Sequence, residues 1–184
     1  MIVGEGDRNL LLPMRWGFPS PWEPSKSLIN TRIESAASKP TWREPLRQRR
    51  CVIPTTGFYE GRGPKGAKQA HHFHLANPAT LLAGIWSRLD VGGEATDCFS
   101  IITTDANEVM RPYHHRMPLI LDEDAMERWL APGPPESLER FVAASQALTL
   151  LISEPPPPLQ RKVKPAPKAK EAPPSGQLGL FQDP

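Results

Sequence analysis

The apolar residues of this 184-residue chain occur in short runs that glycine and proline interrupt. The clearest of these runs are LLLPMRWGF, CVIPTTGFYE, HHFHLA, TLLAGIW, CFSIITT and MPLIL. Short apolar runs between turn-forming residues are typical of β-strands, whereas a helix needs a longer stretch with a period of about 3.6 residues. The spacing of the runs therefore predicts a domain in which sheet dominates.

Helical periodicity is confined to three stretches, residues 39–49, 122–130 and 136–146. The second stretch opens with an aspartate and has acidic residues in its first turn, and the third opens with glutamate and serine. Helix N-termini favour such residues because they accept hydrogen bonds from free backbone N–H groups and complement the helix dipole. We therefore predict an α+β fold, with a curved antiparallel sheet or barrel and a few peripheral helices.

Proline marks the end of the predicted domain. Nine of the 23 prolines follow Glu154, where they alternate with lysine and alanine and leave few apolar residues to bury. A segment of this composition cannot offset the entropy that it would lose on ordering. We therefore predict one domain over residues 1–153, a disordered Pro/Lys-rich linker over 154–176 and a C-terminal tail over 177–184.

Composition excludes several classes of protein. No apolar run approaches the roughly 18 residues that a membrane-spanning helix needs, and no basic leader precedes an apolar stretch, so we expect a cytoplasmic protein without membrane contact. Cys51 and Cys98 lie in apolar contexts without CxxC spacing, which predicts reduced core residues, neither a disulfide nor a zinc site. The net charge of +2 is too small to indicate nucleic-acid binding by itself.

Polar residues gather at three places that a core does not explain. Asn30 and Arg32 belong to LINTRIESAA, whose alternation is strand-like; Glu60 follows two aromatic residues in TTGFYEG; and His114 and Arg116 belong to YHHRMP. Each residue alone also fits a structural role, such as a turn or a solvated strand end. Together, an amide, a carboxylate and an imidazole flanked by two arginines predict a general acid/base site with anion-binding edges.

The motifs MRWGFPSPW, INTRIES, RRCVIPTTGFYE and HHRMPLIL, in this order, resemble the SOS response-associated peptidase (SRAP) family, which processes abasic sites in single-stranded DNA. The similarity extends from about Leu11 to Leu130. It implies a sheet-rich, barrel-like fold with a positively charged groove for single-stranded DNA, and no cofactor. It also implies a covalent enzyme, in which the amine and thiol of an N-terminal cysteine condense with the aldehyde of a ring-opened abasic sugar to form a thiazolidine crosslink.

The same resemblance implies roles for individual residues. Asn30 matches the asparagine that orients the attacking terminus, and Glu60 matches the carboxylate that handles protons around the sugar. His114 matches the imidazole implicated in sugar-ring opening and in strand cleavage or crosslink reversal, whereas His115 falls on a variable position. These three residues are the predicted catalytic groups.

Four further residues are predicted to bind DNA. Arg32 and Arg116 match arginines that bind phosphate, and the planar guanidinium suits phosphate because it donates two hydrogen bonds at once. Trp16 and Trp22 lie in the segment that lines the DNA groove of the family. For Trp16, a place in the hydrophobic core is an equally good interpretation of the sequence.

The chain departs from the family at its start. The family opens with Met-Cys-Gly-Arg, whereas Ile2 occupies the second position here. Cys51 and Cys98 cannot replace the missing cysteine, because the chemistry requires an α-amine and a thiol on one residue. We expect either a start assigned too late or a truncated paralogue. Gly61 also stands where the family usually has tryptophan after GFYE.

Other classes of function fit parts of the same sequence. A metal site built from HHFH at 71–74 with His114 and His115 lacks an accompanying cysteine or aspartate pattern, so no bound metal is predicted. A serine hydrolase is disfavoured because the chain has no GxSxG motif. A module that binds single-stranded DNA without a covalent step remains the alternative, since it would use the same groove.

The end of the chain carries one more motif. The residues Gln177, Leu178, Leu180 and Phe181 form QLGLF, whose apolar side chains have no folding role in a tail of proline, lysine and alanine. The pattern resembles the short peptide with which bacterial polymerases and repair proteins bind the sliding clamp. It predicts the clamp as a partner and an association with the nucleoid.

Overall fold

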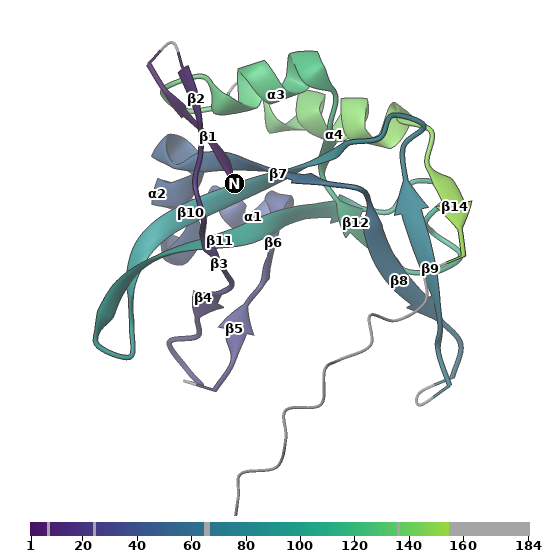
Figure 1. The fold of residues 1–184 in the computed structure, drawn as a ribbon, viewed down its shortest axis with the longest axis horizontal. Helices are drawn as coiled ribbons and strands as arrows, with labels where there is room; N and C mark the ends of the chain where they lie inside the picture. The colour runs from purple at the N-terminus through teal and green to yellow at the C-terminus, as the bar shows by residue number, and fades with distance from the viewer. Residues whose placement is uncertain (7, 24, 65–66, 136, 155–184) are drawn as a thin grey trace, which may run out of the picture.

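The computed structural model describes residues 1–6, 8–23, 25–64, 67–135 and 137–154 (Figure 1). Apart from Glu154, the predicted linker and the predicted tail lie outside these residues. No helix of the described part is long and apolar enough to cross a membrane.

A curled sheet of nine strands forms the centre of the fold, in the order β12-β11-β10-β7-β1-β2, with β13 on β10 and with β3 and β6 on β11. All pairs are antiparallel except those of β3 and β6, which run parallel to β11. The strands are β1 (Ile2–Glu5), β2 (Arg8–Leu11), β3 (Arg15–Trp16), β6 (Asn30–Arg32), β7 (Arg50–Thr55), β10 (Thr80–Val91), β11 (Glu94–Asp105), β12 (Arg116–Pro118) and β13 (Ile120–Leu121). The prediction of a sheet-dominated α+β fold is confirmed.

The long hairpin of β10 and β11 forms the central part of this sheet, as Figure 1 shows. Gly92 and Gly93 form its turn with φ angles of 67° and 90°, a region that other residues rarely adopt. The Asp90 side chain accepts a hydrogen bond from the Gly93 N–H at 3.1 Å. This turn fixes the register over eight residue pairs, from Val91 with Glu94 to Gly84 with Ile101.

Two smaller sheets account for the other strands of the described part of the chain. One has the order β14-β9-β8, and the other pairs β4 with β5. Their strands are β4 (Phe18–Pro19), β5 (Ser27–Leu28), β8 (Phe58–Arg62), β9 (Gln69–His74) and β14 (Leu151–Ser153). Gly57 forms the bend between β7 and β8, with φ at 144°, and a Cβ at this position would come within 2.4 Å of His72 Nε2. Only glycine therefore fits this bend, at which β8 leaves the large sheet and pairs with β9.

In the described residues, four helices lie around the sheet: α1 (Ile33–Ala36), α2 (Pro40–Gln48), α3 (Glu123–Leu130) and α4 (Leu138–Ala147). The last three match the predicted helices. Proline begins α2, and Asp122 caps α3 by accepting from the Ala125 N–H at 2.7 Å. The strand-like reading of residues 28–37 was wrong beyond Arg32, because Ile33 and Ala36 share the buried face of a single helical turn.

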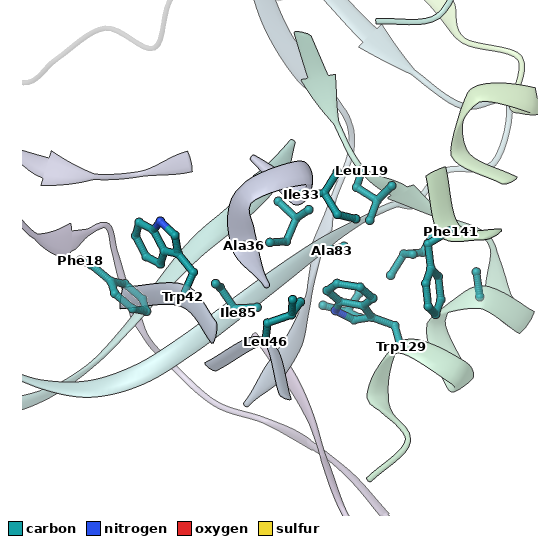
Figure 2. Close-up of a cluster of buried hydrophobic side chains, with 14 of the residues drawn as sticks. Phe18, Ile33, Ala36, Trp42, Leu46, Ala83, Ile85, Leu119, Trp129 and Phe141 are labelled. Atoms are coloured by element: carbon teal, nitrogen blue, oxygen red, sulfur yellow. The ribbon is translucent and has the colours of Figure 1, made fainter. Parts of the chain in front are cut away.

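The core consists of two clusters of buried side chains. The first lies between the sheet and the helices, where the edge of the Trp129 ring meets Phe141 with centroids 5.2 Å apart (Figure 2). The Trp129 indole N–H lies 3.1 Å from the Cys51 carbonyl and 3.2 Å from the Gly84 carbonyl, so it joins α3 to β7 and β10. The second cluster lies toward β8 and β9 and includes Phe73. Cys51 and Cys98 are free and buried, as predicted.

Candidate functional site

A cleft of about 450 Å³ opens over the second core cluster, and all three predicted catalytic residues line it. Asn30 comes from β6, Glu60 from β8 and His114 from the turn before β12. The apolar part of the lining is made of Ile53, Phe58, Leu82, Phe99, Ile101, Met110 and Met117. The cleft therefore combines polar groups from three distant segments with a lining from the core.

Asn30 is positioned by the parallel pairing of β6 with β11, in which it lies opposite Ile101. The next residue, Thr31, is buried and its hydroxyl lies 2.9 Å from the Ser100 hydroxyl. Because successive side chains of a strand point to opposite faces, burial of Thr31 exposes Asn30. The Asn30 amide has no hydrogen-bond partner within the described part of the chain, so it is free to bind a ligand.

Glu60 lies on β8 and is half-buried. One carboxylate oxygen accepts from the N–H of Gly61 at 3.1 Å. Its cross-strand neighbour is His71 on β9, whose ring packs against the edge of Tyr113 with centroids 4.8 Å apart. In the sequence, His71 drew attention only through the disfavoured metal site of residues 71–74, and strand register is what places it beside Glu60.

His114 and His115 differ in position, although their rings lie only 4.4 Å apart. His114 is half-buried in the cleft, and its Nδ1 lies 3.1 Å from the backbone N of Arg116 and 3.0 Å from the Arg116 carbonyl. His115 is exposed and does not line the cleft. With Nδ1 occupied by main chain, Nε2 is the ring nitrogen of His114 that is left for a ligand.

Trp16 is not a core residue: its side chain is 51% exposed at the cleft. Its ring stacks on Phe99 at a centroid distance of 6.3 Å, and its N–H donates to the Ile29 carbonyl at 3.0 Å. These contacts fix the ring while one part of it faces solvent. Trp22 is 79% exposed in the loop between β4 and β5, outside the lining of the cleft.

The two predicted phosphate ligands differ in their surroundings. Arg32 and Arg116 both line a depression of about 370 Å³ beside the cleft. Arg32 is exposed and has no ion pair with any described residue. Arg116 forms ion pairs with Glu34 and Asp105, two residues to which the sequence had given no role. Burial lowers the pKa of Arg116, but the hydrogen bonds and charges of Glu34 and Asp105 outweigh it, so its pKa is raised.

The structure offers no metal centre in its described part, where no group of three or more histidine, cysteine, aspartate or glutamate side chains could hold an ion. His72 and His74 instead stack on one another on β9, with ring centroids 5.2 Å apart. Burial raises the pKa of the Cys51 thiol to about 12, and burial is also the main reason that the pKa of Cys98 is raised. Neither cysteine lines the cleft.

Fold and site together define an α+β protein with a curled half-barrel sheet and an open cleft that Asn30, Glu60 and His114 line. The model of the family "SOS response associated peptidase (SRAP)" matches residues 1–153. The chain therefore belongs to the SRAP family.

Relatives and solved structures agree with this assignment. The chain is 34% identical over 139 residues to the abasic site processing protein YoqW of Bacillus subtilis, covering 71% of this chain and 62% of the relative. The abasic site processing protein HMCES of Gallus gallus is 33% identical over 156 residues, or 68% of this chain and 46% of the relative. The chain thus spans about three fifths of the bacterial relative's length.

A crystal structure of a Bacteroides thetaiotaomicron protein superposes with a TM-score of 0.64 at 28% identity, covering 82% of this chain and 72% of that one. A Bordetella bronchiseptica protein gives a TM-score of 0.59 at 26% identity, covering 76% of this chain and 74% of that one. These likenesses extend over most of the described sheet and helices.

Proposed function

We propose that this protein processes abasic sites in single-stranded DNA. The observation that carries the proposal is the convergence of Asn30, Glu60 and His114 in one cleft of a SRAP domain. The names of the relatives, which are abasic site processing proteins, support it.

The chemistry of an abasic site suits these groups. The ring-opened sugar presents an aldehyde, and both opening the ring and breaking the strand require proton transfer. The Glu60 carboxylate and the His114 imidazole can move these protons, while the Asn30 amide can orient the sugar. The exposed face of Trp16 can stack on a base, and Arg32 can bind phosphate. We also propose that the protein cleaves the DNA strand at the abasic site and that it acts at the nucleoid.

Non-covalent binding of abasic DNA is a second candidate function. Cys51 and Cys98 are buried, and the pKa values of both thiols are raised. A buried thiol with a raised pKa is a poor nucleophile, because the thiolate is the reactive form. We propose that neither Cys51 nor Cys98 forms a covalent link to abasic DNA, and that binding in the cleft does not depend on such a link.

The test compares three fluorescent single-stranded oligonucleotides that differ at one position. One carries a natural abasic site, one a tetrahydrofuran analogue that cannot open to an aldehyde, and one an intact thymidine. We expect salt-sensitive binding of all three, because phosphate contacts release counterions, and a preference for the natural abasic site. His114→Ala should abolish the preference, whereas His115→Ala, the matched control, should keep it.

Two results would contradict these proposals. Equal affinity for the natural abasic site and the intact strand would remove the basis for abasic-site processing, as would equal losses from both histidine variants. A heat-stable adduct of the 184-residue polypeptide on a denaturing gel would overturn the non-covalent role.

A separate proposal concerns the QLGLF motif, residues 177–181, which lies outside the described residues. We propose that it binds the bacterial sliding clamp through Leu178, Leu180 and Phe181, with Gln177 donating or accepting a hydrogen bond at a second subsite. The proline-rich segment before it would act as a tether that keeps the SRAP domain near replicating DNA.

A further inference from the structure

One face of the Tyr59 ring is covered and the other is open. The ring packs against the His72 ring on β9, with centroids 4.8 Å apart and an angle of 31° between the planes. The two residues are cross-strand partners, so their side chains share one face of the β14-β9-β8 sheet. Tyr59 is nevertheless 52% exposed. The face of its ring opposite His72 is therefore available to a flat ligand.

His72 is itself held in place, so the Tyr59 ring has a fixed support. The His72 Nδ1 lies 3.2 Å from the Ser153 hydroxyl on β14, and the His72 ring also stacks on that of His74, with centroids 5.2 Å apart. The His74 Nδ1 in turn lies 2.9 Å from the Leu75 carbonyl. Aromatic rings at these separations attract one another. Three rings thus form one row, and Tyr59 is the member of the row that borders the cleft.

Tyr59 reaches the cleft because β8 is the end strand of its sheet. The order β14-β9-β8 leaves one edge of β8 without a neighbouring strand in the described part of the chain. Successive side chains of a strand point to opposite faces, but at a free edge both kinds can border the same opening. Phe58, Tyr59 and Glu60 accordingly all line the cleft. A base that stacks on Tyr59 would lie close to the sugar on which Glu60 is proposed to act.

Trp16 is the counterpart of Tyr59 on the large sheet. It belongs to β3, which pairs with β11, and it also lines the cleft with a fixed and partly exposed ring. In the view of Figure 1, β3 and β8 lie apart, with β6 and β12 between them. Asn30 is on β6, and His114 lies just before β12. The two exposed rings therefore flank the predicted catalytic groups.

The shape of an abasic site suits this arrangement. An abasic nucleotide has no base, so it offers no surface on which an aromatic ring can stack. Its two neighbours keep their bases, and stacking tolerates any base because every base has a π-face. With the sugar beside Asn30, Glu60 and His114, the neighbouring bases would extend toward Trp16 and Tyr59 at the borders of the cleft.

We propose that Tyr59 and Trp16 form an aromatic pair around the lesion, in which Tyr59 stacks on the base at one side of the abasic nucleotide and Trp16 on the base at the other side. The substrate class is then an abasic site inside a strand, with an intact base on each side. This assignment rests on the proposed function.

The experiment uses single-stranded oligonucleotides with one central tetrahydrofuran analogue of the abasic site. One strand keeps adenine on both sides of the analogue, and two others replace the 5′ or the 3′ adenine with a second analogue. Fluorescence anisotropy should show that the full chain loses affinity at least about fivefold in each replacement, the ratio that the lower limit for one stacked base gives. Tyr59→Ala should stop responding to one replacement, and Trp16→Ala should stop responding to the other.

Two variants are the matched controls. Tyr59→Phe keeps the ring and removes only the hydroxyl, so it should respond to both replacements as the parent does. Leu151→Ala shortens an exposed side chain on the same sheet face, opposite His74 and outside the lining of the cleft, and should also respond as the parent does. Thermal denaturation of Tyr59→Ala should give the Tm of the parent, because the side chain is half exposed, so a lost response reports lost stacking.

Three results would overturn the aromatic pair. If Tyr59→Ala still responds to both replacements, no base stacks on Tyr59. If Tyr59→Ala and Trp16→Ala lose the response to the same replacement, the two rings do not flank the lesion. If the parent binds all three strands equally, neither neighbouring base is stacked. Failure of the parent to bind any of the strands would instead contradict the proposed function itself, so the two failures are distinguishable.

Discussion

The guanidinium of Arg50 lies over the ring of Trp129, 5.9 Å from its centroid, and its Nε donates to the Trp129 carbonyl at 2.5 Å. Its Nη atoms donate to further carbonyls at or just beyond the C-terminal ends of α2 and α3, those of Leu46, Arg47, Ala131 and Gly133. The last carbonyls of a helix have no partner within it. Arg50, the first residue of β7, therefore caps two helices and joins them to the sheet.

Arg50→Met should lower the free energy of unfolding by about 3 kcal/mol. Burial lowers the pKa of Arg50, so its charge costs desolvation energy. The five hydrogen bonds outweigh this cost, because each is worth roughly 1.5–3 kcal/mol to a charged donor and its loss leaves a carbonyl unsatisfied. Urea denaturation measures the change, with Arg47→Gln at an exposed position of α2 as the control. A loss no larger than that of the control would show that the capping is energetically unimportant.

His72 should make the fold sensitive to acid. Burial, and then the neighbouring His74, lower the pKa of His72 below the value of about 6.5 for an unperturbed histidine. The unfolded chain then binds more protons than the folded one, so stability falls as pH decreases below about 6.5 toward the lowered pKa. His72→Phe keeps a ring against Tyr59 and His74 and removes the titration, which should flatten the dependence of Tm on pH.

The measurement is a series of thermal denaturation curves between about pH 7.5 and pH 5, a range that contains the unperturbed histidine pKa. His115→Gln, at an exposed position, is the control and should keep the slope of the parent. An unchanged slope in His72→Phe would assign the acid sensitivity to other groups.

Much of the fold could be predicted because it depends on local patterns. Residues close together in the sequence determine the Gly-Gly turn between β10 and β11 and the first turns of α2 and α3. The single turn of α1 could not be predicted, since a segment of four residues is too short to show a helical period. The parallel placement of β3 and β6 on β11 is non-local and leaves no periodic signal.

The candidate site also combines features that the local sequence predicts with features that depend on contacts between distant residues. Asn30, Glu60 and His114 could be nominated from residue type and motif, and the structure brings them to one cleft. The contact between Glu34 and Arg116 joins residues 82 positions apart, so nothing in either local sequence indicates it. The exposure of Trp16 likewise depends on its stacking against Phe99, which only the register of β3 on β11 decides.

Trp16→Ala should weaken binding of single-stranded DNA more than Trp22→Ala does. Trp16 presents a fixed ring at the cleft, and stacking of one base on an aromatic side chain is worth about 1–3 kcal/mol. Trp22 lies outside the lining of the cleft, so its loss should cost less. Fluorescence anisotropy with an intact oligonucleotide measures both. Both side chains are at least half exposed, so neither variant should unfold the domain. A larger loss from Trp22→Ala would place the path of the strand over the β4–β5 loop instead.

The tail should bind the bacterial sliding clamp with an affinity typical of a single short motif. Two leucines and a phenylalanine follow a segment of proline, lysine and alanine, and apolar side chains in such a sequence context favour a partner. A fluorescent peptide of residues 172–184 should bind purified clamp with a dissociation constant of tens of micromolar or lower, or roughly 7 kcal/mol. A known clamp-binding peptide should displace it.

Specificity for the motif is the decisive part of this prediction. Changing Leu180 and Phe181 together to alanine should abolish binding, because these side chains would fill the apolar pocket that provides most of the free energy. A peptide of the same composition in scrambled order is the matched control, since it keeps the charge and the apolar content but not the spacing. The full chain should compete with the labelled peptide, which tests whether the motif is accessible when the SRAP domain is attached. Equal binding of the scrambled peptide, or no binding at tens of micromolar clamp, would leave QLGLF as an apolar cluster of no consequence for replication.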